Sequence, residues 1–257
     1  DGVWDAEPNK GLLCVAGRFE PLYDMRPRVT QPLVRQKDQL TPATWDEALG
    51  RIAAKLRGGK TLGVATGAMT NEAYQAFAAL FQKAGGAAGR LEPALPELGY
   101  GRAGELADIP GSDFIIVAGA DPLADQRVVG YFIKRALDKG GRLALVGAPE
   151  GGLHAYATLT LPAGEAGPAV KLASQAEKPV VVYGAGITPA TIAGLKPLAD
   201  KALFIGLEPA RNGKGALAAG LQPIEPQKTD AVYLLVGEAP ADGVSAYLNG
   251  GFTVVKA

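Results

Sequence analysis

Residues 112–125, SDFIIVAGADPLAD, and residues 229–242, TDAVYLLVGEAPAD, share one pattern. Each contains an apolar run, then a glycine, and then a proline and an aspartate. Continuous apolar runs of this length are typical of parallel strands that are buried on both faces, and a glycine turn leading into a helix completes a strand–turn–helix unit. The internal echo predicts an α/β fold built from two similar, Rossmann-like parallel-sheet halves.

The regions around these two stretches repeat the unit. Apolar runs predict further strands, and apolar positions at helical spacing predict helices that end at glycines. Strands are expected at 61–66, 142–146, 179–183, 202–205 and 252–255, and helices at 44–57, 70–84, 126–139 and from Thr188 onward. Residues 1–43 are rich in proline and charge and predict an extended N-terminal segment. The first half is then 44–165 and the second is 166–257, with a boundary near 165–178.

Helix starts account for several polar residues. Thr44 and Glu47 form a T-x-x-E capping box, which also explains the paired carboxylates Asp46 and Glu47 without a catalytic role. Gly58 and Gly59 are expected to end this helix. His154 is the only histidine and has no Cys or carboxylate at ligand spacing, so it is assigned no role.

Glycine turns after strands are the candidate cofactor sites. Backbone N–H groups at such turns approach anions closely because no Cβ intervenes. The candidates are Gly119, Asp121 and Pro122 after the first strand, Gly184 and Gly186 after a later strand, and the polar loop 211–215. None completes a G-x-G-x-x-G or P-loop motif, so turns that simply require a positive φ explain the same residues.

Composition excludes several functions. The 257 residues carry 26 Lys+Arg and 26 Asp+Glu, so no whole-molecule field attracts nucleic acid. No apolar run is long enough to cross a membrane, so no direct membrane insertion is expected. Cys14 is the only cysteine and there are three serines, which leaves little nucleophile–base machinery. A solitary cysteine is by default a small buried apolar residue.

The surroundings of Cys14 resemble a known family. Residues 9–19, NKGLLCVAGRF, resemble the segment that carries the fourth cluster cysteine in the molybdopterin oxidoreductase superfamily, which includes formate dehydrogenases and the large iron–sulfur subunit of respiratory complex I. The resemblance continues in order along most of the chain. Further matches are TQPLVR at 30–35, ATWDEAL at 43–49, the "D-I, D-strand, G-x-N-P" element at 108–122, and Asn212, Gly215 and Gly220 in "N-x-x-G-x-x-x-x-G".

This resemblance implies a fold like domains II and III of the family and a [4Fe-4S] cluster with Cys14 as a metal ligand. It also makes a molybdopterin guanine dinucleotide the candidate ligand of Gly119, Asp121, Pro122, Gly184, Gly186, Asn212 and Gly215. Family members hold the cluster with C-x2-C-x3-C and a later cysteine, whereas this chain has only the later one. We therefore expect the other ligands outside the chain and the chain to be a fragment or trimmed, unless the cluster has been lost.

Two departures bear on catalysis. The region 89–101, GRLEPALPELGYG, has no Cys or Ser where active relatives carry the ligand of molybdenum or tungsten, and Ala16 stands where they usually have a lysine. Both departures resemble the complex I subunit. They imply a component of an oxidoreductase complex that has no Mo/W active site of its own.

Three functional hypotheses follow. The first is a non-catalytic electron-transfer or scaffold module with iron–sulfur and flavin proteins as partners, cytoplasmic and membrane-associated only through them. The second is part of a catalytic formate dehydrogenase-type enzyme. The third is a nucleotide-binding α/β domain without a redox role, because residues 179–186, PVVVYGAG, also resemble the middle domain of thiamine-diphosphate enzymes.

Overall fold

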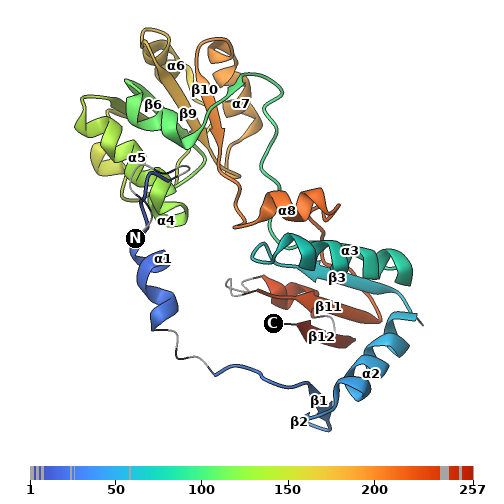
Figure 1. Cartoon of the computed structure of the whole chain (residues 1–257). Helices are drawn as coiled ribbons and strands as arrows, with labels where there is room; N and C mark the ends of the chain where they lie inside the picture. The colour runs from blue at the N-terminus through green and yellow to red at the C-terminus, as the bar shows by residue number, and fades with distance from the viewer. Residues whose placement is uncertain are drawn as a thin grey trace. The chain divides into compact units, whose positions relative to one another are not determined.

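The computed structural model describes residues 3, 6, 9–23, 25, 27–57, 59–237, 243–248 and 251–256. The chain forms two compact units (Figure 1). Unit 1 comprises Asp1–Asp24 and Leu95–Pro209, and unit 2 comprises Met25–Ala94 and Ala210–Ala257. Both units carry parallel sheets with helices, which confirms the expected α/β class.

Unit 1 contains a six-stranded parallel sheet. Its strand order is β5-β10-β9-β6-β7-β8. The strands are β5 (Arg102–Ala103), β6 (Phe114–Ala118), β7 (Arg142–Val146), β8 (Leu159–Leu161), β9 (Pro179–Tyr183) and β10 (Leu203–Gly206). From β6 the chain proceeds outward through β7 and β8, returns to the other side of β6 at β9, and proceeds to β10. The strand order therefore reverses between β6 and β9, as in Rossmann-type sheets.

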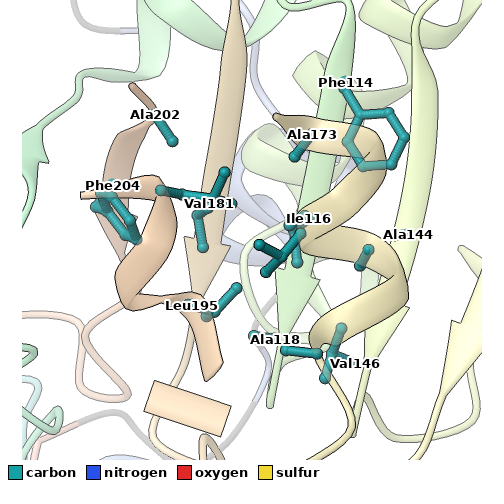
Figure 2. Close-up of a cluster of buried hydrophobic side chains, with 14 of the residues drawn as sticks. Phe114, Ile116, Ala118, Ala144, Val146, Ala173, Val181, Leu195, Ala202 and Phe204 are labelled. Carbon is teal, nitrogen blue, oxygen red and sulfur yellow. The ribbon is translucent and has the colours of Figure 1, made fainter. Parts of the chain in front are cut away.

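Alternate residues of these strands serve two different layers, because side chains along a strand point to opposite faces. Phe114 and Ile116 pack with α6 (Gly167–Ala173) and α7 (Pro189–Leu195), as Figure 2 shows in part. Ile115 and Val117 pack on the other face with α5 (Arg127–Asp138). The side chains of all four strand residues are fully buried, and each such burial contributes about 1.5–3 kcal/mol. The absence of polar alternation in the sequence is thus explained by a sheet covered on both faces.

Unit 2 contains a four-stranded parallel sheet in the order β12-β11-β3-β4. The strands are β3 (Thr61–Ala65), β4 (Ala87–Arg90), β11 (Ala231–Leu235) and β12 (Phe252–Lys256), and the helices are α2 (Trp45–Arg57), α3 (Asn71–Ala84) and α8 (Gly213–Ala218). The Phe77 and Phe81 rings of α3 press on the sheet at Gly63. A Cβ there would lie 2.5 Å from the Phe81 ring, so any larger residue would force the two rings to shift.

The units do not follow the boundary expected near residues 165–178. Strands β8 and β9 flank that boundary but belong to the same sheet. The two echoed stretches, by contrast, supply β6 to unit 1 and β11 to unit 2. Periodicity identifies a strand but carries no information on which distant strand pairs with it. A division of the chain at a single boundary therefore could not find these units, because each is built from two separate segments.

The N-terminal segment is less extended than expected. It contains α1 (Val15–Phe19), the 3-10 helix η1 (Glu20–Leu22), and an antiparallel hairpin of β1 (Leu33–Gln36) and β2 (Gln39–Pro42). These elements are too short to show a period in the sequence. The hairpin turns at Lys37, whose φ is +55°.

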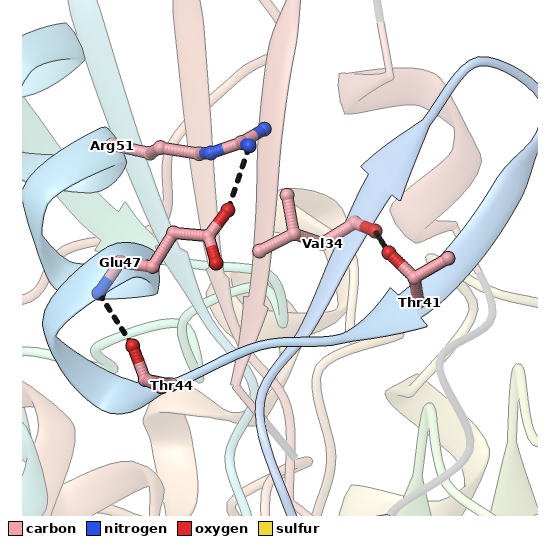
Figure 3. Close-up of polar contacts among 5 residues, drawn as sticks. All are labelled: Val34, Thr41, Thr44, Glu47 and Arg51. Carbon is pink, nitrogen blue, oxygen red and sulfur yellow. Dashed lines mark hydrogen bonds and ion pairs between the residues drawn. The ribbon is translucent and has the colours of Figure 1, made fainter.

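The expected start of α2 is confirmed in part (Figure 3). The Glu47 N–H donates to Thr44 Oγ1 at 3.2 Å, so Thr44 caps the helix. The Glu47 carboxylate instead accepts a hydrogen bond from Arg51 Nη2 at 2.8 Å. Gly58, expected at the end of this helix, and residues 238–242 of the second echoed stretch lie outside the described residues.

Smaller helical elements complete the fold. In unit 1 these are α4 (Pro122–Asp125) and the 3-10 helices η2 (Leu106–Gly111), η3 (His154–Tyr156) and η4 (Lys196–Leu198), and in unit 2 η5 (Val244–Tyr247). In the part of the chain that the structure describes, no helix has the length and apolar character needed to span a bilayer.

Candidate functional site

Open parallel sheets bind ligands at the carboxyl ends of their strands, where the strand order reverses. In unit 1 this point lies between β6 and β9, and in unit 2 between β3 and β11. We therefore ask whether the predicted glycine turns and polar loops at these two points could bind a cofactor.

The unit 1 turns contact each other directly. Gly119 follows β6, whereas Gly184 and Gly186 follow β9. The Gly184 N–H donates to Ala118 O at 3.0 Å, and the Gly186 N–H donates to Gly119 O at 3.1 Å. The structure thus brings Gly119 together with Gly184 and Gly186, two predicted site residues that lie more than 60 residues further along the chain.

This contact leaves no room for a side chain at Gly119. Its φ is +59°, and a Cβ would lie 2.1 Å from Ile187 N and 2.3 Å from the Gly186 carbonyl carbon. Both the conformation and the close backbone approach require glycine. Packing of one turn on the other therefore suffices to explain this glycine, without a bound anion.

Asp121 and Pro122 begin the short helix α4. The Asp121 carboxylate accepts the Leu123 N–H at 3.1 Å, and Pro122 occupies the first turn and is buried. Gly151 packs directly on the same carboxylate, since a Cβ at Gly151 would lie 2.0 Å from Asp121 Oδ2. Asp121 acts here as a helix cap.

Gln126 is a polar residue at this edge of the sheet that sequence reasoning did not identify. Its Nε2 donates to Glu208 O at 2.8 Å, just after β10. Its Oε1 is buried and has no hydrogen-bond partner among the described residues. An unpaired buried acceptor is uncommon in proteins. The only feature of the sequence that could have pointed to Gln126 is its position four residues after Pro122, at the predicted turn.

In unit 2, side chains of the chain itself occupy the turn after β3. The buried Gly67 N–H donates to Glu92 Oε1 at 2.8 Å, and the Gly237 N–H donates to Thr66 Oγ1 at 3.0 Å. The Tyr74 hydroxyl donates to Thr66 O at 2.8 Å and accepts the Met69 N–H at 3.2 Å. Burial raises the pKa of Tyr74. A carboxylate thus holds the glycine amide that an anionic ligand would use at such a turn.

Asn212 and Gly215 brace the same turn. The Asn212 N–H donates to Gly67 O at 2.7 Å, and Asn212 Nδ2 donates to Met69 O and to Asn71 Oδ1, each at 2.9 Å. Asn212 Oδ1 accepts the Gly215 N–H at 3.2 Å and so caps α8. The structure brings these two predicted residues together in unit 2, whereas Gly119, Gly184 and Gly186 belong to unit 1.

Cys14 is half-buried and caps the N-terminus of α1. Its Sγ accepts the Gly17 N–H at 3.3 Å. The described residues contain no group of three or more His, Cys, Asp and Glu side chains that could hold a metal ion. A cubane cluster requires a ligand at each iron corner, so this chain alone does not fit a [4Fe-4S] cluster.

One cavity of unit 1 lies away from the switch point. A cavity of about 390 Å³ lies at the opposite, amino end of the sheet, where Asp108, Glu177, Lys178 and Lys201 line it. His154, to which sequence analysis assigned no role, accepts the Gly151 N–H at Nδ1 at 3.2 Å. Neither feature adds a catalytic group to the switch point.

Most of the chain matches a known protein family. Residues 28–191, which are more than half of the chain, match the family model described as molybdopterin oxidoreductase.

Two curated relatives are similar over long stretches. The F420-dependent formate dehydrogenase 1 subunit alpha of Methanococcus maripaludis is 27% identical over 154 residues, which cover 54% of this chain and 23% of the relative. A subunit of the NADH-quinone oxidoreductase of Rhizobium meliloti is 25% identical over 200 residues, which cover 72% of this chain and 23% of the relative. This chain thus spans about a quarter of the length of each.

A solved structure shares the fold. A chain of the formyltransferase/hydrolase complex from Methylorubrum extorquens, determined in complex with methylofuran, superimposes with a TM-score of 0.58 at 16% identity. The match covers 82% of this chain and 77% of that chain. At this identity the likeness supports the α/β architecture alone.

Proposed function

This chain belongs to the molybdopterin oxidoreductase family, and we propose that it is a non-catalytic module of a multisubunit redox complex in which Cys14 contributes one ligand to a [4Fe-4S] cluster. Its relatives include subunits of formate dehydrogenase and of NADH-quinone oxidoreductase, as their names state. The proposal has two parts, a scaffold role for the sheets and a ligand role for Cys14.

One observation carries the scaffold role: Glu92 occupies the Gly67 amide at the unit 2 switch point. An anionic cofactor group approaching this turn would meet a carboxylate already seated there, and like charges at close range repel. Asn212 and Gly215 are likewise engaged within the protein. These residues fit a closed, self-braced turn better than an open cradle for a pterin nucleotide.

The unit 1 turn supports the same conclusion. Gly119, Gly184 and Gly186 pack on each other, and the carboxylate of Asp121 caps α4. With Pro122 they are the remaining candidates for a retained molybdopterin guanine dinucleotide, but their backbone contacts are explained without one. The segment 89–101 also contains no Cys or Ser that could bind molybdenum or tungsten.

The ligand role rests on the setting of Cys14. Residues 9–19 around it resemble the segment that carries a cluster cysteine in the family, and thiolates are the ligands of iron–sulfur clusters. Since the sequence contains one cysteine, three further ligands would have to come from outside these 257 residues. We propose iron–sulfur and flavin subunits as partners, in a cytoplasmic complex that contacts the membrane only through them.

The substitution Cys14→Ser tests the ligand role. Serine is a strong N-cap, so its Oγ preserves the contact with the Gly17 N–H, whereas a hydroxyl is a poor ligand for iron in a cluster. In the assembled complex we expect one low-potential iron–sulfur signal to disappear from the EPR spectrum while the complex stays intact. Cys14→Ala is the matched control, because it removes the cap and the thiolate together.

Three outcomes would contradict the proposal. An EPR spectrum of the Cys14→Ser complex identical to that of the unmodified complex would eliminate Cys14 as a ligand. Stoichiometric molybdenum or tungsten bound to this chain would eliminate the non-catalytic role and favour a formate dehydrogenase-type enzyme. A complex without iron would leave only the scaffold role.

A second candidate function is a nucleotide-binding α/β domain without a redox role. The observation in its favour is the unpaired, buried Gln126 Oε1 at the carboxyl edge of the unit 1 sheet, which an N–H group of a base would satisfy. A dinucleotide should then raise the melting temperature of the protein, and Gln126→Leu should abolish that increase. No increase at millimolar dinucleotide would dismiss this candidate.

A further inference from the structure

Asn212 and Gly213 form an Asn–Gly pair at the start of α8. Deamidation is chemically easiest at such a pair, because glycine is conformationally permissive and has no side chain to hinder attack by its backbone nitrogen on the asparagine side chain. The sequence therefore identifies Asn212 as a reactive amide. Whether it reacts depends on the folded structure.

The side-chain amide of Asn212 is held on both sides. Its Nδ2 donates to Met69 O and to Asn71 Oδ1, each at 2.9 Å, and its Oδ1 accepts the Gly215 N–H at 3.2 Å. Gly215 lies directly against this amide, since a Cβ there would be 2.5 Å from Asn212 Oδ1 and 2.6 Å from Asn212 Nδ2. The amide therefore cannot turn toward the following peptide bond unless these three hydrogen bonds break.

The attacking nitrogen is held as well. Gly213 is buried, and its N–H donates to Ala210 O at 3.2 Å. The Asn212 N–H donates to Gly67 O at 2.7 Å, which fixes the backbone of this segment to the turn after β3. Ring closure requires Gly213 N to approach Asn212 Cγ, so the segment has to leave the turn by local opening before it can react.

We propose that Asn212 is a deamidation site that is protected while the unit 2 turn is closed and reacts only when that turn opens. In the reaction, Gly213 N bonds to Asn212 Cγ, the bond from Cγ to Nδ2 breaks, and ammonia leaves. Water then opens the resulting succinimide ring and gives aspartate or isoaspartate at position 212. One water is consumed, one ammonia is released, and no atom is oxidised or reduced.

The modification would make the opening permanent. A carboxylate at position 212 has no proton to donate, so Met69 O and Asn71 Oδ1 would each lose a donor. The aspartate product can still accept the Gly215 N–H, because aspartate is a strong N-cap. The product therefore keeps the cap of α8 but loses the bonds that hold the turn closed.

The test incubates the full chain in mildly alkaline buffer and quantifies deamidated peptides over time by mass spectrometry. The same measurement in urea gives the rate for the unfolded chain, where the second Asn–Gly pair of the sequence, at 249–250, serves as the calibration. We expect Asn212 to deamidate more than about a hundredfold more slowly in the folded protein, because several hydrogen bonds have to break first.

A pair of variants separates protection by the turn from a general effect of folding. Asn71→Ala removes one acceptor of the Asn212 amide and should raise the rate in the folded protein about fivefold, the factor that one hydrogen bond contributes. Gln75→Ala is the matched control, because Gln75 is also exposed on α3 but makes none of these contacts with Asn212, and it should leave the rate unchanged. Circular dichroism confirms that both variants are folded.

A third variant reproduces the product. Asn212→Asp should increase hydrogen–deuterium exchange of the backbone amides at 66–71, because the turn then opens more often. This measurement does not depend on the rate of deamidation.

Three results would overturn the inference. These are equal rates at Asn212 in the folded and unfolded chains, equal rates in Asn71→Ala and Gln75→Ala, and unchanged exchange at 66–71 in Asn212→Asp. None of these measurements involves Cys14 or iron, so the outcome is independent of the proposed cluster.

Discussion

Replacing Gly119 with alanine should destabilise unit 1 by about 4 kcal/mol. The left-handed backbone conformation at φ +59° disfavours alanine by about 1 kcal/mol. The added Cβ would lie 2.1–2.6 Å from backbone atoms of Gly186 and Ile187, which cannot rotate away as a side chain can. Separating the two turns would add about 1–3 kcal/mol of overpacking and about 1 kcal/mol for the Gly186 N–H to Gly119 O hydrogen bond.

Gly140→Ala is the matched control for the conformational contribution. Gly140 lies in the same unit with a φ of +92°, but a Cβ added there would project into open space. Its replacement should therefore destabilise the unit by only about 1 kcal/mol. Urea-induced unfolding followed by circular dichroism, with the transition of unit 1 fitted separately, measures both values. The difference of about 3 kcal/mol is then the combined contribution of overpacking and of the lost hydrogen bond at the turn–turn contact.

A Gly119→Ala protein as stable as Gly140→Ala would contradict this account. It would mean that the two turns are not packed on each other, and that the glycine serves an open approach for a ligand. Strong destabilisation would instead show that the backbone conformation and the turn packing require glycine here without a ligand, which supports the scaffold role of the unit 1 turns.

Three further predictions concern polar contacts. Thr191 is buried and its Oγ1 accepts the Gly164 N–H at 2.8 Å. Thr191→Val should therefore lower the free energy of unfolding, measured by urea titration, by about 1–3 kcal/mol. No change would mean that the Gly164 N–H finds another partner. Asp113 accepts the N–H groups of Glu177 and Lys178 at 2.7 and 2.8 Å. Burial alone would raise the pKa of the Asp113 carboxyl, but these bonds hold it below its ordinary value. The stabilising contribution of the Asp113 carboxylate is thus present above about pH 4 and is lost as the pH falls through its pKa in the folded protein. Asp113→Asn should therefore destabilise the protein by about 1–2 kcal/mol at pH 7 and by much less near pH 2. A difference that does not vary with pH would argue against the charged hydrogen bonds. Glu47 and Arg51 form an exposed ion pair. Glu47→Gln should therefore change the free energy of unfolding by less than about 0.5 kcal/mol in the same urea titrations. A larger loss would mean that the pair is buried in the assembled protein.

The local elements could be predicted because their signals are local. The strands 142–146 and 179–183 have the predicted bounds, and Thr70 and Thr188 cap helices through their side-chain oxygens. A continuous apolar run and an N-cap followed by a helical pattern lie within a few residues of the feature that they specify. The short helix α1 and the hairpin were missed because neither is long enough to show a period.

The candidate sites were predicted less completely, because their contacts are not local. Gly119 and Gly186 were each identified as turn residues, but nothing in the sequence showed that they meet. The bond from the Gly67 N–H to Glu92 and the bond from the Gly237 N–H to Thr66 join residues 25 and 171 positions apart. Apolar positions at helical spacing predicted the helix at 44–57, yet Trp45 and Leu49 within it are exposed.

The amino-acid sequence was sufficient to establish the α/β class, most strands and helices, and the family resemblance, since each depends on residue order within short windows. The tertiary structure was needed to divide the chain into units made of non-contiguous segments and to show that the glycine turns close on the chain itself. The physical reason is that strand pairing and turn packing depend on which buried surfaces meet across the sheet. Residues far apart in the chain supply those surfaces, and no local pattern records the match between them.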